Sequence, residues 1–294
     1  MNTPNMIRVF GRIGCLSFGG PAAQIALMQK ELVEDRPWLS ERQFLNALSF
    51  CMLLPGPEAM QLATYSGWRI AGTLGGLIAG LLFVIPGALV MLVLALLYTW
   101  LGNVPLVEAL FLGIKATVVI IVLQALLKVA KKALKGADHW IIAAFSFVAI
   151  FFFAVPFPVI ILIAALYGAL KGGQAADPAP PLGKANTLRT ITIWGTLWWA
   201  PIGALWLSGN QFLTDLALFF SKLAIVTFGG AYAVLAYMTQ EVVQTQGWLT
   251  TAQMMDGLGL AETTPGPLIL VTEFVGYLAG FGAGGIGLGI IAAV

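Results

Sequence analysis

An internal duplication is the feature that most limits how this chain can fold. Residues 10–57 align without a gap with residues 220–267, and sixteen of the 48 aligned pairs are identical. The identical pairs include an FGG at residues 18–20 and 228–230, and a PGP at residues 55–57 and 265–267. Shared hydrophobicity does not reproduce glycine, proline, tryptophan and glutamate at one constant offset. The chain therefore holds two copies of one structural unit.

The composition places both copies in a membrane. Hydrophobic residues make up 59% of the 294 residues and charged residues only 10%, whereas a soluble domain carries about 25% charged residues. Segments 74–101 and 104–127 are long enough to cross the roughly 30 Å hydrocarbon layer. We find no alternation typical of a β-barrel, so we predict an all-α integral membrane protein, a polytopic helical bundle. The net charge of +2 gives no case for a nucleic-acid partner.

The inventory of reactive side chains argues against an enzyme. The two cysteines lack CxxC spacing, and His139 is the only histidine. A Cys/His metal site is therefore nearly excluded, and a histidine-based triad has little to build on. We predict no catalytic residue, no metal and no cofactor. An intramembrane enzyme that uses a carboxylate pair is the alternative that this inventory leaves open.

Prolines and basic residues suggest the organisation of the chain. We expect a first repeat at 1–170, a cytoplasmic linker at 171–190, and a connecting helix with an incomplete second repeat at 191–294. Residues 139–170 are interrupted by PFP and are predicted to form a helical hairpin. Basic residues flank this hairpin on both sides, which places those flanks in the cytoplasm. The helix at 191–208 has no counterpart before residue 10, and an unpaired crossing would invert the second repeat relative to the first.

The FGG and PGP motifs are predicted to break helices. Glycine costs about 1 kcal/mol relative to alanine inside a helix, and proline removes an N–H donor. In a bilayer, broken helices are tolerated only where they are buried in protein or line a cavity. The first N–H groups of the half-helix that follows form an anion site. We therefore predict broken, re-entrant helices around a site shared by two related halves, an arrangement typical of transporters. Close packing of small residues is the alternative.

Polar side chains accompany these breaks. Ser17 and Thr227 precede the two FGG motifs and offer hydroxyl donors at equivalent positions. Gln61 follows the first PGP motif, and Thr264 precedes the second. An ionisable residue at depth costs about 2.5–3.5 kcal/mol on insertion scales and is usually functional. We assign coupling or gating roles to six charged residues: Glu58, Glu262, Arg12, Arg69, Glu31 and Glu241.

Two of these assignments have a competing interpretation. Arg12 and Arg69 lie close to the motifs and could attract an anion, but both could equally reach lipid headgroups. The segment with Glu31 and Arg36 is interpreted either as a solvated loop anchored by Trp38 or as a gating salt bridge.

At this point the motifs resemble those of the chromate ion transporter family. The stretch from SFGGPAAQ to PGPEAMQLATYSGW resembles the N-terminal half of that family, and the stretch from TFGGAYAVLAYM to AETTPGPLILVTEF resembles its C-terminal half. The resemblance covers residues 8–90 and 220–280. With the two threonines above, it assigns substrate binding to Ser17, Phe18, Gly19, Gly20, Pro21, Pro55, Gly56, Pro57, Gln61, Thr227, Phe228, Gly229, Gly230, Thr264, Pro265, Gly266 and Pro267.

The resemblance implies a multi-pass carrier of the bacterial inner membrane that expels chromate and confers resistance, with proton-coupled exchange as its mechanism. It also implies a lipid environment, and it is compatible with a homodimer. Family members with both halves are longer than this chain. A carrier of sulfate or another oxyanion and a non-transporting assembly subunit are the alternatives.

The physics of the substrate suits export. Chromate is a tetrahedral dianion, so its site needs many N–H and O–H donors. Moving two charges through 100 mV releases about 4.6 kcal/mol, twice the 2.3 kcal/mol for one charge. This corresponds to a gradient of roughly two-thousandfold without ATP. Because Glu58 and Glu262 would repel the anion when ionised, we hypothesise that one of them is protonated when the anion binds.

Overall fold

The computed structural model describes residues 3–101, 137–153, 157–171, 187–227 and 237–294, together with single positions between these ranges. Every regular element in this described part is a helix, which confirms the predicted fold class at that level. The chain divides into two compact units. Unit 1 comprises Met1–Leu123 and Phe219–Val294, and unit 2 comprises Gln124–Leu218. The division at residues 170 and 190 follows the duplication in the sequence and stays a prediction.

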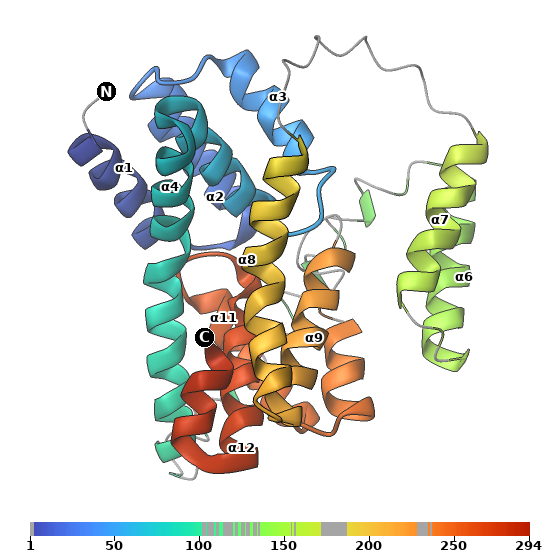
Figure 1. The fold of residues 1–294 in the computed structure, drawn as a ribbon. Helices are drawn as coiled ribbons and strands as arrows, with labels where there is room; N and C mark the ends of the chain where they lie inside the picture. The colour runs from blue at the N-terminus through green and yellow to red at the C-terminus, as the bar shows by residue number, and fades with distance from the viewer. Residues whose placement is uncertain are drawn as a thin grey trace. The chain divides into compact units, whose positions relative to one another are not determined.

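Unit 1 contains the described elements of the two aligned segments, 10–57 and 220–267, and the helices that follow each of them (Figure 1). The first copy supplies α1 (Thr3–Leu16), α2 (Gly20–Gln29), the π-helix η1 (Lys30–Glu34), α3 (Glu41–Cys51) and α4 (Glu58–Leu101). The second supplies the end of α9 (Gln211–Val226), the π-helix η2 (Gln240–Thr245), α11 (Thr251–Thr263), the 3-10 helix η3 (Leu268–Leu270) and α12 (Val271–Ala293).

Local sequence explains why the elements of the two copies correspond. Ser40 caps α3 in a capping box with Gln43, and Thr250 caps α11 in a capping box with Gln253. In both boxes the hydroxyl accepts from the third backbone N–H, while the glutamine side chain accepts from the backbone N–H of the cap residue. These pairs lie 210 residues apart, as do the two π-helices that precede them.

Both α4 and α12 fold back on themselves. The backbone leaves helical geometry at Gly72, with φ 64°, and at Gly285, with φ 77°. The two arms then pack closely, because a Cβ added to Gly67 would lie 2.3 Å from the carbonyl oxygen of Gly75, and one added to Gly280 only 2.6 Å from the returning arm. Each element is therefore a helical hairpin. Figure 1 shows α4 and α12 turning back at opposite ends of unit 1.

The core of unit 1 lies between α1 and α4. Phe10 and Ile13 on α1 are fully buried with Phe83 of α4 and Phe44 of α3. Residues three apart on a helix face the same side, so α1 presents one apolar face to α4. This packing fixes the end of α1, where the first FGG motif begins.

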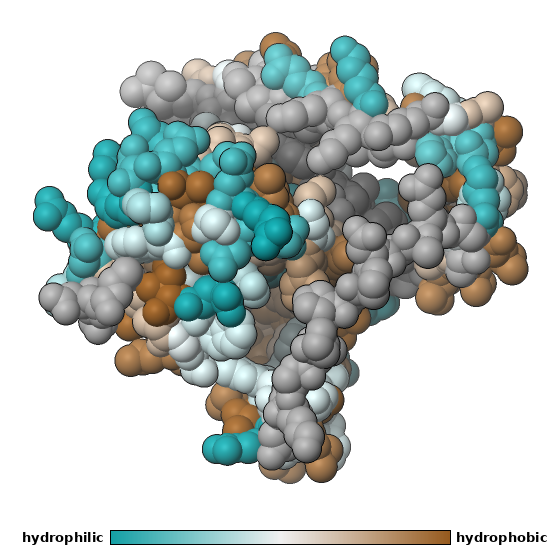
Figure 2. All heavy atoms as spheres, turned by 90° about the horizontal axis from the view of Figure 1, so that it is seen from above, coloured by the Kyte–Doolittle hydropathy of each residue, from teal (hydrophilic) through white to brown (hydrophobic). Residues whose placement is uncertain are grey.

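The outer surface of unit 1 carries large hydrophobic side chains. Leu74 and Trp100 of α4 are each 65% exposed, and Figure 2 shows hydrophobic residues on the surface beside hydrophilic ones. In the described part, Glu58–Leu101 and Leu268–Ala293 are long and apolar enough to cross a membrane. Most of the predicted span 104–127 lies outside the described residues.

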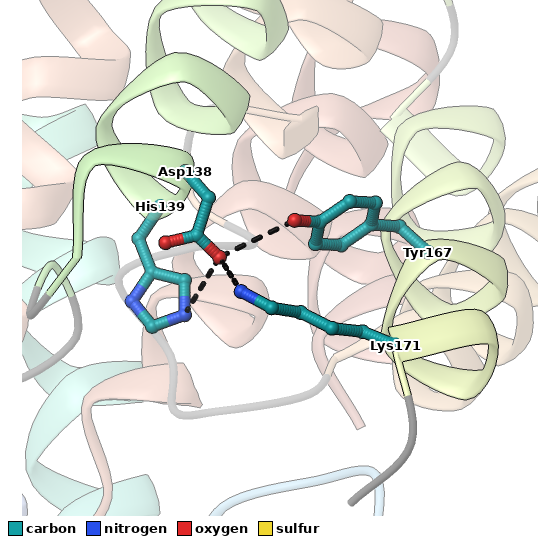
Figure 3. Close-up of polar contacts among 4 residues, drawn as sticks. All are labelled: Asp138, His139, Tyr167 and Lys171. Atoms are coloured by element: carbon teal, nitrogen blue, oxygen red, sulfur yellow. Dashed lines mark hydrogen bonds and ion pairs between the residues drawn. The ribbon is translucent and has the colours of Figure 1, made fainter.

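Unit 2 contains α6 (Ala137–Phe153), α7 (Phe157–Lys171), α8 (Thr187–Leu207) and the first part of α9. The start of α6 meets the end of α7, because Asp138 accepts hydrogen bonds from Lys171 and from Tyr167 (3.3 Å) and lies 3.8 Å from Nε2 of His139 (Figure 3). The predicted hairpin is therefore confirmed. The hydrogen bond from Lys171 lowers the pKa of Asp138 to about 2. Most of the predicted linker lies outside the described residues.

Candidate functional site

The first FGG motif breaks the chain between α1 and α2. Helix α1 ends at Leu16, and Gly19 adopts φ 82° and ψ 25° at the N-cap of α2. Only glycine enters this left-handed region without a steric cost. Pro21 follows at the start of α2, where its fixed φ suits the first turn. The predicted break is confirmed at these residues. Phe18 is 46% exposed.

Both PGP motifs also break the chain. Helix α3 ends at Cys51 before the first motif, and α11 ends at Thr263 before the second. Gly56 has φ 112° and Gly266 has φ 90°. Each glycine lies between two prolines that cannot donate a backbone hydrogen bond, so the glycine N–H is the one donor of its motif.

Those two N–H groups reach across to the other copy. The backbone N–H of Gly56 donates to the carbonyl oxygen of Thr227 (2.7 Å), and the N–H of Gly266 donates to the carbonyl oxygen of Ser17 (2.9 Å). Ser17 and Thr227 are equivalent positions, and so are Gly56 and Gly266. Two crossing hydrogen bonds therefore join the breaks: each links the PGP break of one copy to the FGG break of the other. The two bonds occupy equivalent positions in the duplication. We call these the Ser17–Gly266 junction and the Thr227–Gly56 junction.

Each junction has a glutamine beside it. Gln24 of α2 donates from Nε2 to the carbonyl oxygens of Gly266 (2.7 Å) and Ser17 (3.3 Å). Gln61 of α4 donates from Nε2 to the carbonyl oxygen of Pro55 (2.5 Å). Gln61 was predicted from the sequence, whereas Gln24 was not. Gln24 is a polar residue in the apolar stretch PAAQIALM, and this could have indicated a buried polar contact.

The hydroxyl groups at the breaks do not point their protons toward a ligand here. Ser17 donates to the carbonyl oxygen of Ile13 (2.6 Å), Thr227 to that of Leu223 (2.6 Å), and Thr264 to that of Ala261 (3.1 Å). These side chains instead bond to backbone carbonyls one turn earlier. All three hydroxyl groups therefore already donate within the protein, and their substrate role stays a prediction.

Backbones approach closely around the Ser17–Gly266 junction. A Cβ added to Gly14 would lie 1.9 Å from the carbonyl oxygen of Leu82, and one added to Gly87 would lie 2.1 Å from that of Pro265. The end of α1 and the second PGP motif therefore both lie against α4, without side chains between them.

Charged residues near η1 form an ion-pair network. Glu31 is buried, at 2% exposure, and its carboxylate pairs with Arg12 (3.3 Å) and with Arg36. Because Glu31 is buried, its interpretation as part of a solvated loop is wrong. The two ion pairs supply the contacts that the salt-bridge interpretation requires. In the second copy, Glu241 accepts a hydrogen bond from Gln246 (3.3 Å).

The remaining predicted residues are placed as follows. Glu58 is the first residue of α4, and Glu262 lies in the last turn of α11, both partly exposed. Arg69 is exposed at the far end of the same arm of α4, beside the break at Gly72, so the fold does not bring it to the junctions. Phe228, Gly229 and Gly230 lie outside the described residues.

A second buried polar cluster was not predicted. Asp256 of α11 is 3% exposed and accepts a hydrogen bond from the Tyr98 hydroxyl of α4 (2.9 Å). One residue further along α4, the Thr99 hydroxyl lies 3.1 Å from that of Tyr277 on α12. An aspartate in the apolar sequence MMDGLGL could have signalled it. In the described residues, no group of three His, Cys, Asp or Glu side chains could hold a metal ion.

Comparison with known proteins identifies relatives along almost the whole chain. The chromate transport protein of Pseudomonas aeruginosa is 32% identical over 98% of this chain and 69% of its own length. The probable chromate transport protein of Synechococcus elongatus is 31% identical over 94% of the chain and 69% of its own length. The chromate transport protein of Cupriavidus metallidurans is 29% identical over 93% of the chain and 67% of its own length.

No solved structure matches the chain. The family model described as "Chromate transporter" matches residues 4–169 and 214–294, which include both FGG motifs, both PGP motifs and both crossing hydrogen bonds. The chain therefore belongs to the chromate transporter family of membrane proteins.

Proposed function

We propose that the chain is a secondary transporter that carries chromate, or a closely similar tetrahedral oxyanion, out of the cytoplasm across the inner membrane and so gives chromate resistance. The observation that carries this proposal is the pair of crossing hydrogen bonds, Gly56 to Thr227 and Gly266 to Ser17. They join broken helices of two related segments at one place, where a transporter holds its substrate.

The donors for the anion are backbone amides. The first four N–H groups of a helix, which in α2 belong to residues 19–22, have no partner within the helix, and no side chain of the described residues caps α2. Pro21 removes one of these donors, which leaves those of residues 19, 20 and 22 beside the Ser17–Gly266 junction. The N-terminus of α4 lies in the same way beside the first PGP motif. Such N–H groups and the helix dipole favour a doubly charged oxyanion.

The two copies form an inverted repeat in this proposal. The opposite ends at which α4 and α12 turn back in Figure 1 support it, as does the equivalence of the two junctions. Rocking of one copy against the other would then expose the site first to the cytoplasm and then to the outside. The membrane potential supplies about 4.6 kcal/mol per dianion at 100 mV.

Proton coupling follows from the carboxylates at the breaks. Glu58 begins the half-helix after the first PGP motif, and Glu262 lies four residues before Gly266. An ionised carboxylate beside the anion repels it, so protonation of either residue would permit binding. If Glu58→Gln and Glu262→Gln both leave the pH dependence of transport unchanged, the coupling residue lies elsewhere.

Uptake of radiolabelled chromate into inverted vesicles tests the proposal. Vesicles that contain the chain should accumulate chromate when an inside-positive potential is imposed, and the variant Gly56→Ala should lower the rate by roughly tenfold because φ 112° strains any residue with a Cβ. Gly203→Ala on α8, where a Cβ meets nothing within 4 Å, is the matched control. Accumulation no greater than in vesicles that lack the chain would refute the proposal.

Competition identifies the substrate. Sulfate has the same shape and charge as chromate and should compete if the site reads only those two properties. Stronger transport of sulfate than of chromate would favour the sulfate carrier. If chromate uptake occurs only with a lengthened form of the chain, the assembly subunit is favoured. Chemical cross-linking of the chain in the same vesicles tests whether it forms a homodimer.

A further inference from the structure

We propose that Gln24 is a positioning residue that fastens the first FGG break to the second PGP break, so that these two breaks move as one piece during transport. The inference goes beyond the proposed function, and it rests on that function only for its transport readout.

The contacts of Gln24 close a small network. Its Nε2 donates to the carbonyl oxygens of Gly266 and Ser17, at 2.7 and 3.3 Å, while the N–H of Gly266 donates to Ser17 at 2.9 Å. Each of the three residues thus bonds to the other two. Because both acceptors are carbonyl oxygens, only the NH2 end of the amide can face them, which fixes the orientation of the side chain.

This arrangement is not explained by stability alone. Gln24 is 1% exposed, and its buried Oε1 has no hydrogen-bond partner among the residues that the structure describes. A buried acceptor left unpaired is unfavourable, whereas an apolar residue of similar shape would lose the bonds that Nε2 donates to the two carbonyl oxygens. What the apolar residue could not do is hold the carbonyl groups of both breaks together. The geometry therefore points to a role in positioning the breaks.

The two junctions differ in this respect. The residue 210 positions after Gln24 is Val234, which has no hydrogen-bonding side chain. Gln61 bonds to Pro55 within its own copy and does not reach across. Among the contacts that the structure describes between the two copies, the Thr227–Gly56 junction has its main-chain hydrogen bond, whereas the Ser17–Gly266 junction has that bond and Gln24. Within the described residues, the Ser17–Gly266 junction therefore has one more side chain that links the two copies.

Hydrogen exchange measures this difference at single residues. Each PGP motif contains one amide proton, that of its glycine, because the flanking prolines have none. We expect the amide of Gly266 to exchange more slowly than that of Gly56 in the full chain in lipid nanodiscs. Gln24→Leu should raise exchange at Gly266 by roughly tenfold and leave Gly56 unchanged. Unchanged exchange at Gly266 in this variant would overturn the proposal.

Transport by two variants separates positioning from filling of space. Gln24→Leu and Gln24→Glu have similar size, but the carboxyl introduced by Gln24→Glu can donate to a carbonyl oxygen only when it is protonated. The ratio of chromate uptake by Gln24→Glu to that by Gln24→Leu should therefore rise as the pH falls. The ratio cancels every effect of pH that both variants share. A ratio that stays flat with pH would mean that Gln24 only fills space.

A charge control completes the design. Gln29→Glu places the same charge on α2, five residues away and outside both junctions, and should show no such pH dependence relative to Gln29→Leu. If the wild-type chain moves no chromate, the proposed function fails, but exchange at Gly266 in nanodiscs still decides the role of Gln24. The two failures are therefore distinguishable.

Discussion

Replacing Gly14 by alanine should disrupt the Ser17–Gly266 junction from a distance. A Cβ at Gly14 would lie 1.9 Å from the carbonyl oxygen of Leu82, and real Cβ contacts essentially never fall below 3.0 Å. The end of α1 must therefore move away from α4 by at least about 1.1 Å, the difference between these two distances. Leu82 contributes a backbone atom to this contact, so a change of rotamer cannot relieve it.

The shift has a calculable effect three residues later. The bond from Gly266 to Ser17 is 2.9 Å long, and a displacement of about 1.1 Å along it would extend it beyond hydrogen-bonding range. Overpacking costs about 1–3 kcal/mol and the lost bond about 0.5–1.5 kcal/mol. The higher helix propensity of alanine stabilises the variant by about 1 kcal/mol relative to glycine. We expect a net loss of roughly 0.5–3.5 kcal/mol and strongly reduced transport.

Gly11→Ala is the matched control on the same helix, because a Cβ there meets nothing within 4 Å. This variant should be as stable as the wild type or slightly more stable. The assay is thermal unfolding in detergent together with chromate uptake into inverted vesicles. If Gly14→Ala and Gly11→Ala behave alike in both measurements, the close approach of α1 to α4 is not what holds the junction.

Three further predictions concern other parts of unit 1. Glu31→Gln should lower the thermal unfolding midpoint more than Glu241→Gln, because it removes a buried charge that pairs with two arginines; equal midpoints would contradict the network. Tyr98→Phe should destabilise the chain by about 1.5–3 kcal/mol through loss of the donor to a buried carboxylate, and unfolding in denaturant would measure it. Gly285→Ala should cost about 1–2 kcal/mol because its φ of 77° is left-handed, whereas Gly282→Ala, with equally open space, should cost nothing; a zero difference would argue against the hairpin.

The first set of breaks was predictable because glycine and proline act locally. An FGG or PGP motif disfavours a helix whatever surrounds it, so the ends of α1, α3 and α11 follow from the sequence. The breaks inside α4 and α12 were not predicted. Gly67 and Gly75 let the two arms pack, while Gly72 turns the chain, and all three lie within one short stretch of sequence. Their different roles depend on tertiary packing.

The hydrogen bonds between the two copies could not be predicted from the sequence. The bonds from Gly56 and Gly266 end on backbone carbonyls, which every residue has, so they leave no pattern in the side chains. The duplication predicted that the motifs correspond but not that each bonds to the other copy. The duplication did not indicate Gln24, because the equivalent position in the second copy holds Val234. The burial of Glu31 depends in turn on how α1 and α2 pack.

The crossing of the two junctions has a consequence for biogenesis. The first PGP motif donates to Thr227, and the Ser17 carbonyl before the first FGG motif accepts from Gly266, so both partners are synthesised long after the first motifs. The N–H of Gly56 and the carbonyl oxygen of Ser17 therefore lack these partners until the second copy has been synthesised. Two copies of a half-length ancestral chain could form the same two hydrogen bonds between them. Gene fusion would then place both partners in one polypeptide without changing these bonds.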